Sequence, residues 1–559
     1  MQLLRDSYRF HAAQETVTEF LARNRKAAIV SIAAFVLLLG TICLAVDPAY
    51  FYPRMTNDPL QYFLKGVAFA EHGTTAARYA VNQAPFEYVS APGVLRAPLL
   101  IMFTEFDARL RAIQLTNILL LALVGVLFAY FLSWALPAAR KWAALPLTFA
   151  FILINPIWLS NVFQPWADAP YAAACCAFLA TTIRLVRPGV SRRKVFVLTI
   201  ASIVFFAIAL LIKFTAPALL LVPILLLLGK ERRGSKRNPR LTLLVTAAAL
   251  ILIVTFAIVS APVLKYYGKI GMSYIQEGDH IAMVTNLFAL AVPSQLLPSF
   301  YGAFATPPLA NDLHPNFFVT TRDVVVTAVG ILISAVVVIG MISRRRELAP
   351  EIAYVIAPLP ILLPIVSSTA RYLMTYQPFV WLFFLAGMAM LARPLVSRVG
   401  ERRAALVGAG AMAVLLATAL VLRVSRVSGN FSRGQPVVSA RAATGYIRDV
   451  SSTFREARVF LERLPREQTL LVSPAVPGRW TAILGLPYYA PDKNLEEVAK
   501  TQTLYLITEC GTQEPCQDFS AWDSSQRAQV ERFGQFRFVP VFDRERRYSK
   551  VRVYRIERL

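Results

Sequence analysis

Long apolar runs separated by short polar loops fill most of the chain. Runs of about 18 or more apolar residues are long enough to cross a bilayer as a helix. We therefore predict a polytopic α-helical membrane protein with about eleven transmembrane helices. The predicted spans are residues 27–46, 112–135, 143–160, 169–186, 195–212, 215–229, 241–263, 322–342, 352–367, 373–392 and 404–422.

Two of these runs need a choice of interpretation. The first run, 27–46, lies behind a polar N-terminal segment and is longer than the apolar core of a signal peptide, so we predict a retained span. The run 195–229 lies between two basic loops, and one helix cannot have both ends on the same side of a membrane. We predict two helices here, with a turn at "KFTAP" that places Lys213 near the outer face and Pro217 in the first turn of the returning helix.

The pattern after residue 422 is that of a small α/β domain. "VFLERLPREQTLLVSP" indicates a helix, a turn and a strand, and "KNLEEVAKTQTLYLITE" repeats that order. "FRFVPVFDRE" and "SKVRVYRIERL" indicate two closing strands. We divide the chain into a membrane module, 1–422, and a C-terminal domain, 423–559, with large outer loops at 47–111 and 264–321.

Charge changes this picture by fixing an orientation. The chain is 56% hydrophobic and its formal net charge is +25. When the spans are folded as a zigzag with the N-terminus inside, the basic clusters fall on one face, which is the cytoplasmic face by the positive-inside rule. The basicity is then a matter of topology and does not indicate a nucleic-acid partner. The clusters are Arg140/Lys141, Arg187/Arg192/Arg193/Lys194, Lys230/Arg232/Arg233/Lys236/Arg237, Arg344/Arg345/Arg346 and Arg398/Arg402/Arg403.

The five cysteines agree with this orientation. Cys43, Cys175 and Cys176 lie in predicted spans, where buried thiols pack as small apolar groups. Cys510 and Cys516, in "CGTQEPC", suit a disulfide, which requires an oxidising compartment; free thiols are the alternative. The C-terminal domain is accordingly expected outside the cytoplasm.

Candidate chemistry gathers at the outer boundary, at junctions between loops and helices. Ionisable groups at membrane depth are costly and usually functional. Cations can bind a phosphate and stabilise it as a leaving group, and a carboxylate can take a proton from an acceptor hydroxyl. This inventory suits an enzyme that uses a lipid-phosphate donor. The candidates are Asp58, Arg96, Asp168, Lys213, Arg371 and Tyr372.

Asp58 opens "DPLQYFLKGVAFAEHG", in which Leu60, Phe63, Leu64 and Val67 recur at helical spacing. This pattern predicts an amphipathic helix lying along the membrane surface. Each candidate also has a structural interpretation: a helix cap for the two acids, snorkelling or boundary marking for the cations, and the aromatic belt for the tyrosine.

Histidines add little to the inventory. His72, His280 and His314 lie in outer loops, and "EGDH" at 277–280 offers metal-ligand types without a metal-binding spacing. We predict no definite cofactor and leave a divalent metal open.

Five stretches, in order, resemble motifs of the GT-C superfamily of membrane glycosyltransferases, in layout the aminoarabinose transferase and protein O-mannosyltransferase type. They are "TNDPLQYFLKGVAF", "LRAPLLIMF", "ADAPYAAA", "LLIKFTAPALLLVP" and "ARYLMTYQPF". The resemblance implies Asp58 as general base, Asp168 in a supporting role in the site, and Arg96, Lys213, Arg371 and Tyr372 near the donor phosphate. The chain departs from the family pattern where many relatives carry a second acid, because Asn57 and Pro59 flank Asp58. A second departure is in "LRAPLLIMF", which resembles the family stretch "KPPL". Here Arg96 stands in place of the Lys, and Ala97 stands in place of the first Pro.

The resemblance implies transfer of a hexose or pentose from a polyprenyl-phosphate donor to a lipid, glycan or protein acceptor. The reaction would take place on the periplasmic face of a bacterial inner membrane, among membrane lipids. Two alternatives stay open: a transporter or flippase for lipid-linked sugars, and a non-catalytic membrane scaffold. A transporter would carry ionisable residues near the midplane and broken helices in paired halves, whereas the candidates here cluster at one face.

Overall fold

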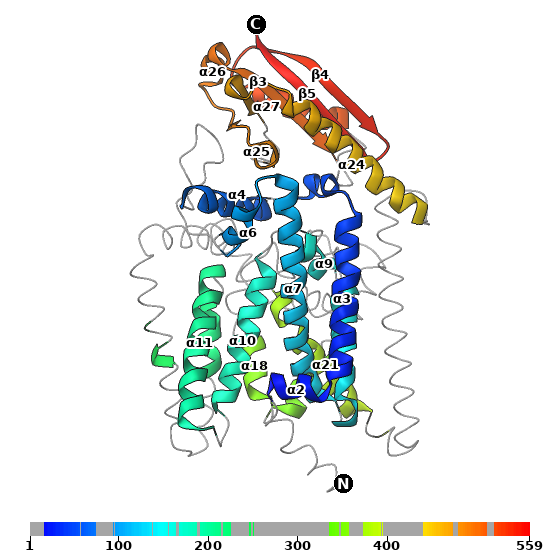
Figure 1. Cartoon of the computed structure of the whole chain (residues 1–559), viewed down its shortest axis with the longest axis vertical. Helices are drawn as coiled ribbons and strands as arrows, with labels where there is room; N and C mark the ends of the chain where they lie inside the picture. Colours follow the sequence, from blue (N-terminus) through cyan, green and yellow to red (C-terminus); the bar gives the residue numbers. More distant parts are fainter. Residues whose placement is uncertain are drawn as a thin grey trace. The chain divides into compact units, whose positions relative to one another are not determined.

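A computed structural model gives the structure of the chain (Figure 1). It describes residues 16–55, 57–73, 93, 95–136, 138–154, 156–163, 167–186, 190–213, 216–224, 245–247, 250, 332, 335–345, 348–356, 373–392, 394, 440–472, 479–510 and 519–559. The chain forms two compact units. The helical unit comprises Met1–Leu37, Leu119–Ser160 and Asp168–Arg423, and the loop–tail unit comprises Leu38–Ile118, Asn161–Ala167 and Val424–Leu559.

Three of the described helices are long and apolar enough to cross a membrane. They are α3 (Arg25–Ala45), α7 (Phe106–Leu132) and α11 (Arg192–Ile212), whose candidate span is Arg193–Ile212. They correspond to the first, second and fifth predicted spans. Large apolar side chains on these helices are exposed, for example Leu37 and Phe196, as expected of surfaces that face lipid. The membrane character of the chain is therefore confirmed, while the count of about eleven spans stays a prediction.

Helix α10 (Asp168–Val186) and α11 pack side by side as an antiparallel pair. Ser191 caps α11 by accepting a hydrogen bond from the Lys194 backbone N–H. At about 1.5 Å per residue, α10 is about 28 Å long, close to the thickness of a bilayer's hydrocarbon core. Helix α11 ends at Ile212, and the chain continues after a break as the 3-10 turn η4 (Ala216–Leu220). The predicted break at "KFTAP" is thus present.

The predicted span 143–160 differs from the structure. The segment forms two helices, α8 (Ala144–Ile154) and α9 (Pro156–Phe163), because Pro156 cannot donate the backbone hydrogen bond that a continuous helix requires at that position. Within the later predicted spans, the structure describes shorter helices: Ala335–Arg344, α18 (Ala349–Ile356) and α21 (Gln377–Leu391), the last preceded by η8 (Leu373–Tyr376). Spans 241–263 and 404–422 lie almost wholly outside the described residues, and loop 264–321 lies wholly outside them.

The tail forms a five-stranded mixed sheet with the order β2-β1-β3-β5-β4. Strand β1 pairs in parallel with β2 and β3, and β5 pairs antiparallel with β3 and β4. The predicted order of helix, strand, helix, strand and two closing strands is confirmed, with a short helix and strand added after β1 and one helix after β3. The elements are α24 (Ala440–Glu462), β1 (Thr469–Val472), α25 (Arg479–Leu484), β2 (Tyr488–Tyr489), α26 (Leu495–Thr501), β3 (Thr503–Cys510), α27 (Phe519–Glu531), β4 (Phe536–Arg546) and β5 (Ser549–Arg558).

Both faces of this sheet are covered, and β3 shows why. Its side chains alternate between two hydrophobic clusters, as the two-residue period of a strand requires. Leu504 and Leu506 belong to a small cluster that includes Leu495 and Val530, from α26 and α27. Tyr505 and Ile507 belong to a larger cluster on the opposite face.

The larger cluster joins the tail to the first outer loop. The loop contributes η1 (Pro48–Arg54), α4 (Asn57–His72) and α6 (Ala97–Met102). Its buried side chains, Phe51, Phe63 and Leu100 among them, share one core with Phe454 and Trp480 of the tail. A continuous core cannot be divided by a bilayer, so the first outer loop and the tail lie on the same side of the membrane. The predicted domain boundary at 422/423 remains a prediction.

Candidate functional site

The candidate acid of the first outer loop lies at the start of α4. This helix begins at Asn57, so Asp58 occupies its first turn, where the helix dipole favours a negative charge. The Asp58 side chain lies outside the described part of the chain. The predicted amphipathic helix is present, but Leu60 and Phe63 on its apolar face are buried in the core that the loop shares with the tail. Protein, rather than lipid, therefore covers these side chains.

Two buried cations accompany this helix. Arg96 occupies the N-cap position of α6, is 5% exposed, and donates from Nη2 to Oδ1 of Asn117 at 3.4 Å. Burial lowers the pKa of Arg96 to about 10. Lys65 lies in the middle of α4 and is fully buried, and this burial lowers its pKa to about 7. The sequence prediction included Arg96 and missed Lys65. A signal existed, because a residue seven positions after Asp58 lies two turns along nearly the same face of the helix.

A glycine contact brings α4 and the start of α6 together. A Cβ atom built on Gly66 would lie 2.7 Å from Leu100 Cδ1 and 3.0 Å from the Gly93 carbonyl oxygen. A Cβ atom on Gly93 would lie 2.9 Å from the backbone nitrogen of Gly66. The Arg96 backbone N–H in turn donates to the Gly93 carbonyl at 3.0 Å. Lys65 directly precedes Gly66, and Arg96 lies three residues after Gly93, so this close approach sets the spacing of the two segments that carry the cations.

The helical unit contains a second predicted pair, Asp168 and Lys213. Lys213 Nζ donates to Asp168 Oδ1, and the two side chains are 6% and 0% exposed. Asp168 begins α10 and Lys213 is the C-cap of α11, so each charge has the sign that its helix end favours. The Lys213 ammonium also lies 5.2 Å from the centroid of the Tyr171 ring, within reach of a cation–π interaction. The structure therefore brings these two candidates together at one end of the antiparallel helix pair.

The remaining predicted site residues are only partly described. Arg371 and Tyr372 lie outside the described residues, immediately before η8. Cys43, Cys175 and Cys176 are buried free thiols, as predicted. Cys510 carries a disulfide bond at the end of β3, and Cys516 lies outside the described residues, so the pairing of Cys510 with Cys516 stays a prediction.

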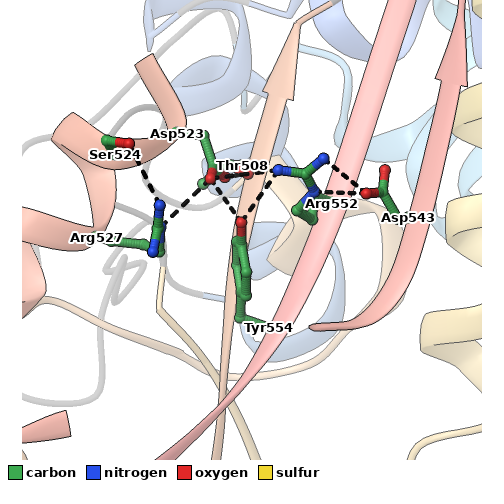
Figure 2. A network of polar contacts seen from close by, with 7 residues as sticks. All are labelled: Thr508, Asp523, Ser524, Arg527, Asp543, Arg552 and Tyr554. Carbon is green, nitrogen blue, oxygen red and sulfur yellow. Dashed lines mark hydrogen bonds and ion pairs between the residues drawn. The ribbon is translucent and has the colours of Figure 1, made fainter. Parts of the chain in front are cut away.

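A polar network in the tail has a structural explanation. Asp523 of α27 is 2% exposed and accepts hydrogen bonds from Thr508 Oγ1 and Tyr554 OH, both at 2.5 Å (Figure 2). Arg527 and Arg552 complete the shell of this carboxylate at 3.3 and 3.5 Å. The chain itself thus surrounds the buried acid with donors, as a buried charge requires. The network ties α27 to β3 and β5.

The fit of a divalent metal can be tested on the described residues. Within them, no group of three or more His, Cys, Asp or Glu side chains is placed to hold a metal ion. The "EGDH" stretch at 277–280 lies outside the described residues, as do His280 and His314. The described residues therefore assign no metal ligand, and the chemistry below uses none.

Comparison with known proteins gave structural neighbours and no sequence relatives. No protein-family model and no curated protein matches the chain. The structure is similar to ArnT from Cupriavidus metallidurans bound to undecaprenyl phosphate, at 14% identity and a TM-score of 0.48, over 93% of this chain and 98% of that one. It is also similar to the oligosaccharyltransferase AglB from Archaeoglobus fulgidus in complex with an inhibitory peptide and a dolichol-phosphate. That match has 12% identity and a TM-score of 0.49, and it covers 91% of this chain and 72% of that one.

A further structure of the Archaeoglobus fulgidus oligosaccharyltransferase, in complex with Zn and sulfate, has a TM-score of 0.46 at 11% identity, over 91% of this chain and 72% of that one. These neighbours include an ArnT and an oligosaccharyltransferase, and the family likeness drawn from the sequence motifs stands as a resemblance. Because the TM-scores lie below 0.5, the likeness carries no argument about the reaction or about any residue.

Proposed function

We propose that the chain is a membrane glycosyltransferase of the GT-C type. It transfers a sugar from a polyprenyl-phosphate donor to an acceptor on the outer, periplasmic face of a bacterial inner membrane. The observation that carries this proposal is the packing of α4 against α6. That packing places an acid-bearing helix start and two buried cations, Lys65 and Arg96, in one compact piece of the loop–tail unit.

The two cations suit the phosphate of the donor. A cation away from water interacts more strongly with an anion, because the effective dielectric constant around it is low. Arg96 can hold phosphate oxygens through its planar guanidinium. Lys65, whose pKa is lowered to about 7 by burial, adds a point charge in its protonated form, which a neighbouring phosphate anion favours. Both charges would stabilise the negative charge that grows on the phosphate as it leaves.

Asp58 supplies the base in this proposal. An acceptor hydroxyl oxygen forms a bond to the anomeric carbon of the sugar, and the bond from that carbon to the phosphate oxygen breaks. The electron pair of the broken bond leaves with the polyprenyl phosphate, and the proton of the hydroxyl passes to the Asp58 carboxylate. Direct attack inverts the configuration at the anomeric carbon. The location of Asp58 in the first turn of α4 supports this role, since the loop lies outside the spanning helices.

Asp168 and Lys213 have a supporting role in this proposal. Lys213 is a further cation for the donor phosphate, and Asp168 holds its ammonium in place. Both residues lie at helix ends rather than at helix centres. A transporter would carry such a pair near the middle of the membrane, so this location favours the transferase over the flippase.

The experiment uses purified protein in lipid nanodiscs and a panel of radiolabelled polyprenyl-phosphate sugars, with membrane extract as the acceptor source. Undecaprenyl- and dolichyl-phosphate sugars head the panel, because those carriers occur in the neighbouring structures. We expect label from one donor to move to an acceptor. A parallel assay in proteoliposomes measures transbilayer movement of the same donors. Movement without any transfer would replace the transferase by a transporter, and neither activity would favour a scaffold.

A further inference from the structure

An arginine of the tail reaches the backbone directly before the candidate acid. Arg479, the first residue of α25, is 5% exposed and donates from Nη2 to the Met55 carbonyl oxygen at 3.3 Å. Met55 is itself fully buried and lies three residues before Asp58. Helices α25 and α4 are also in contact. The tail therefore contacts the loop at the place where α4 begins.

The guanidinium of Arg479 is held on its other side by the sheet. Its Nη1 forms an ion pair with Glu509 of β3, a residue that is itself largely buried. Trp480 Nε1 donates to the second oxygen of the same carboxylate at 2.8 Å. The carboxylate and the neighbouring indole thus fix the direction of the guanidinium, and Nη2 of Arg479 remains to donate to the Met55 carbonyl oxygen. Arginine suits this arrangement because its planar fork serves two acceptors at once.

A second arginine holds the same stretch of loop from α24. Arg458 Nη1 donates to the Tyr52 hydroxyl at 2.7 Å and forms an ion pair with Asp107 at 2.9 Å. The Tyr52 hydroxyl donates to Asp107 at 2.6 Å, and the Met55 N–H donates to the Tyr52 carbonyl at 3.2 Å. Residues 52–55 are therefore held by tail arginines at both ends.

We propose that Arg479 is a positioning residue of the transferase, which fixes the start of α4 and thereby the place of the Asp58 carboxylate. This inference rests on the proposed function for the role of Asp58. It gives the C-terminal domain a task in the reaction, since the acid on the first outer loop depends on a contact from the tail. Arg479 contacts neither donor nor acceptor in this account.

The first test needs no substrate. Hydrogen exchange of backbone amides is compared between wild type and Arg479→Lys in nanodiscs. Lysine keeps the charge beside Glu509 but has no second arm for Met55. We expect exchange in the first two turns of α4 to rise about tenfold, and exchange in β3 and β5 to stay unchanged. Arg555→Lys is the matched control, because Arg555 forms an ion pair with Glu557 at the surface of β5. This variant should leave the exchange rates in α4 unchanged. Unchanged exchange in α4 of Arg479→Lys would overturn the proposal.

The second test uses the transfer reaction. We expect Arg479→Lys to lower kcat about tenfold and to leave the KM for the donor within about twofold, because the cations proposed for the phosphate are unaffected. In the background of Asp58→Asn, Arg479→Lys should cause no further loss, because the carboxylate that it positions is absent. Independent, multiplying losses would overturn the proposal.

Two provisions keep these outcomes separable. If Arg479→Lys does not fold, Glu509→Gln weakens the anchor of Arg479 at the same volume and should give the same changes, smaller in size. If the wild type transfers no sugar, the proposed function fails, whereas the exchange experiment still decides whether Arg479 fixes the start of α4.

Discussion

Lys213 and Asp168 form a buried ion pair between the C-cap residue of α11 and the first residue of α10. At the opposite end of the pair, Arg184 lies in the last turn of α10 and α11 begins with Arg192, Arg193 and Lys194. The basic residues and the buried ion pair are therefore separated by the length of α11. This is the arrangement that the positive-inside rule requires when the ion pair lies at the outer face.

Breaking this ion pair should destabilise the helical unit. Lys213→Met leaves the Asp168 carboxylate buried without its ammonium, at a cost of about 3–5 kcal/mol. Melting in detergent, followed by tryptophan fluorescence, should therefore shift strongly downward. Lys194→Met, at an exposed position near the start of α11, is the control and should melt close to wild type. Equal melting of the two variants would show that the ion pair does not stabilise the fold.

The contact between α4 and α6 should tolerate no side chain at Gly93. An alanine there places its Cβ 2.9 Å from the Gly66 nitrogen and 3.0 Å from the Tyr62 carbonyl oxygen, and backbone atoms cannot move aside cheaply. Gly93→Ala should cost about 1–3 kcal/mol and weaken donor binding, because it pushes Arg96 away from α4. Gly40→Ala in α3 is the control, since nothing lies within 4 Å of its Cβ. Normal melting and donor affinity of Gly93→Ala would contradict the packing.

Buried Lys65 should make stability depend on pH. Its pKa in the folded chain is about 7 against 10.5 for a solvated lysine. Between these values the unfolded chain binds a proton that the folded chain has released, so the free energy of unfolding rises with pH. Lys65→Met should have a higher melting temperature than wild type near pH 7, and this difference in melting temperature should become smaller towards pH 10. Lys500→Met, on the exposed surface of α26, is the control. Its melting temperature should differ from that of wild type by the same amount at each pH. If the difference in melting temperature between Lys65→Met and wild type grew with pH, the lowered pKa of Lys65 would be refuted.

The buried carboxylate in the tail should be essential for its fold. Asp523→Ala leaves the hydroxyls of Thr508 and Tyr554 without their acceptor, and removes the anion that Arg527 faces (Figure 2). The expected cost is about 3 kcal/mol or more. Limited proteolysis of the tail should accelerate in this variant. Asp543→Asn, at a carboxylate that is 45% exposed, should leave the cleavage rate near that of wild type.

Sequence patterns predicted the elements whose signal is local. The apolar lengths gave α3, α7 and α11, the turn at "KFTAP" gave Lys213 its place at a helix end, and alternation gave the strands of the tail. Pro156 was the missed local signal, because a proline inside an apolar run interrupts the helix there.

What the sequence could not predict depends on contacts between distant segments. The apolar face of α4 has the same pattern whether lipid or protein covers it, so Phe63 gave no sign of the core that it shares with Phe454. Arg479 and Met55 are separated by more than four hundred residues, and no periodicity relates them. Asp168 and Lys213 were both identified as candidates, but only the packing of α10 on α11 makes them a pair.

The most direct test of the account measures transfer by Asp58→Asn at saturating donor, with donor affinity measured separately on the same sample. A general base contributes about 10²–10⁴-fold to a rate. We predict that kcat falls by at least about 100-fold while the Kd of the donor changes by less than about threefold, because the phosphate is bound by cations elsewhere. Glu467→Gln, at an exposed carboxylate of the tail, should transfer at the wild-type rate. Wild-type turnover by Asp58→Asn would contradict the account, because the acid at the start of α4 would then have no part in the reaction.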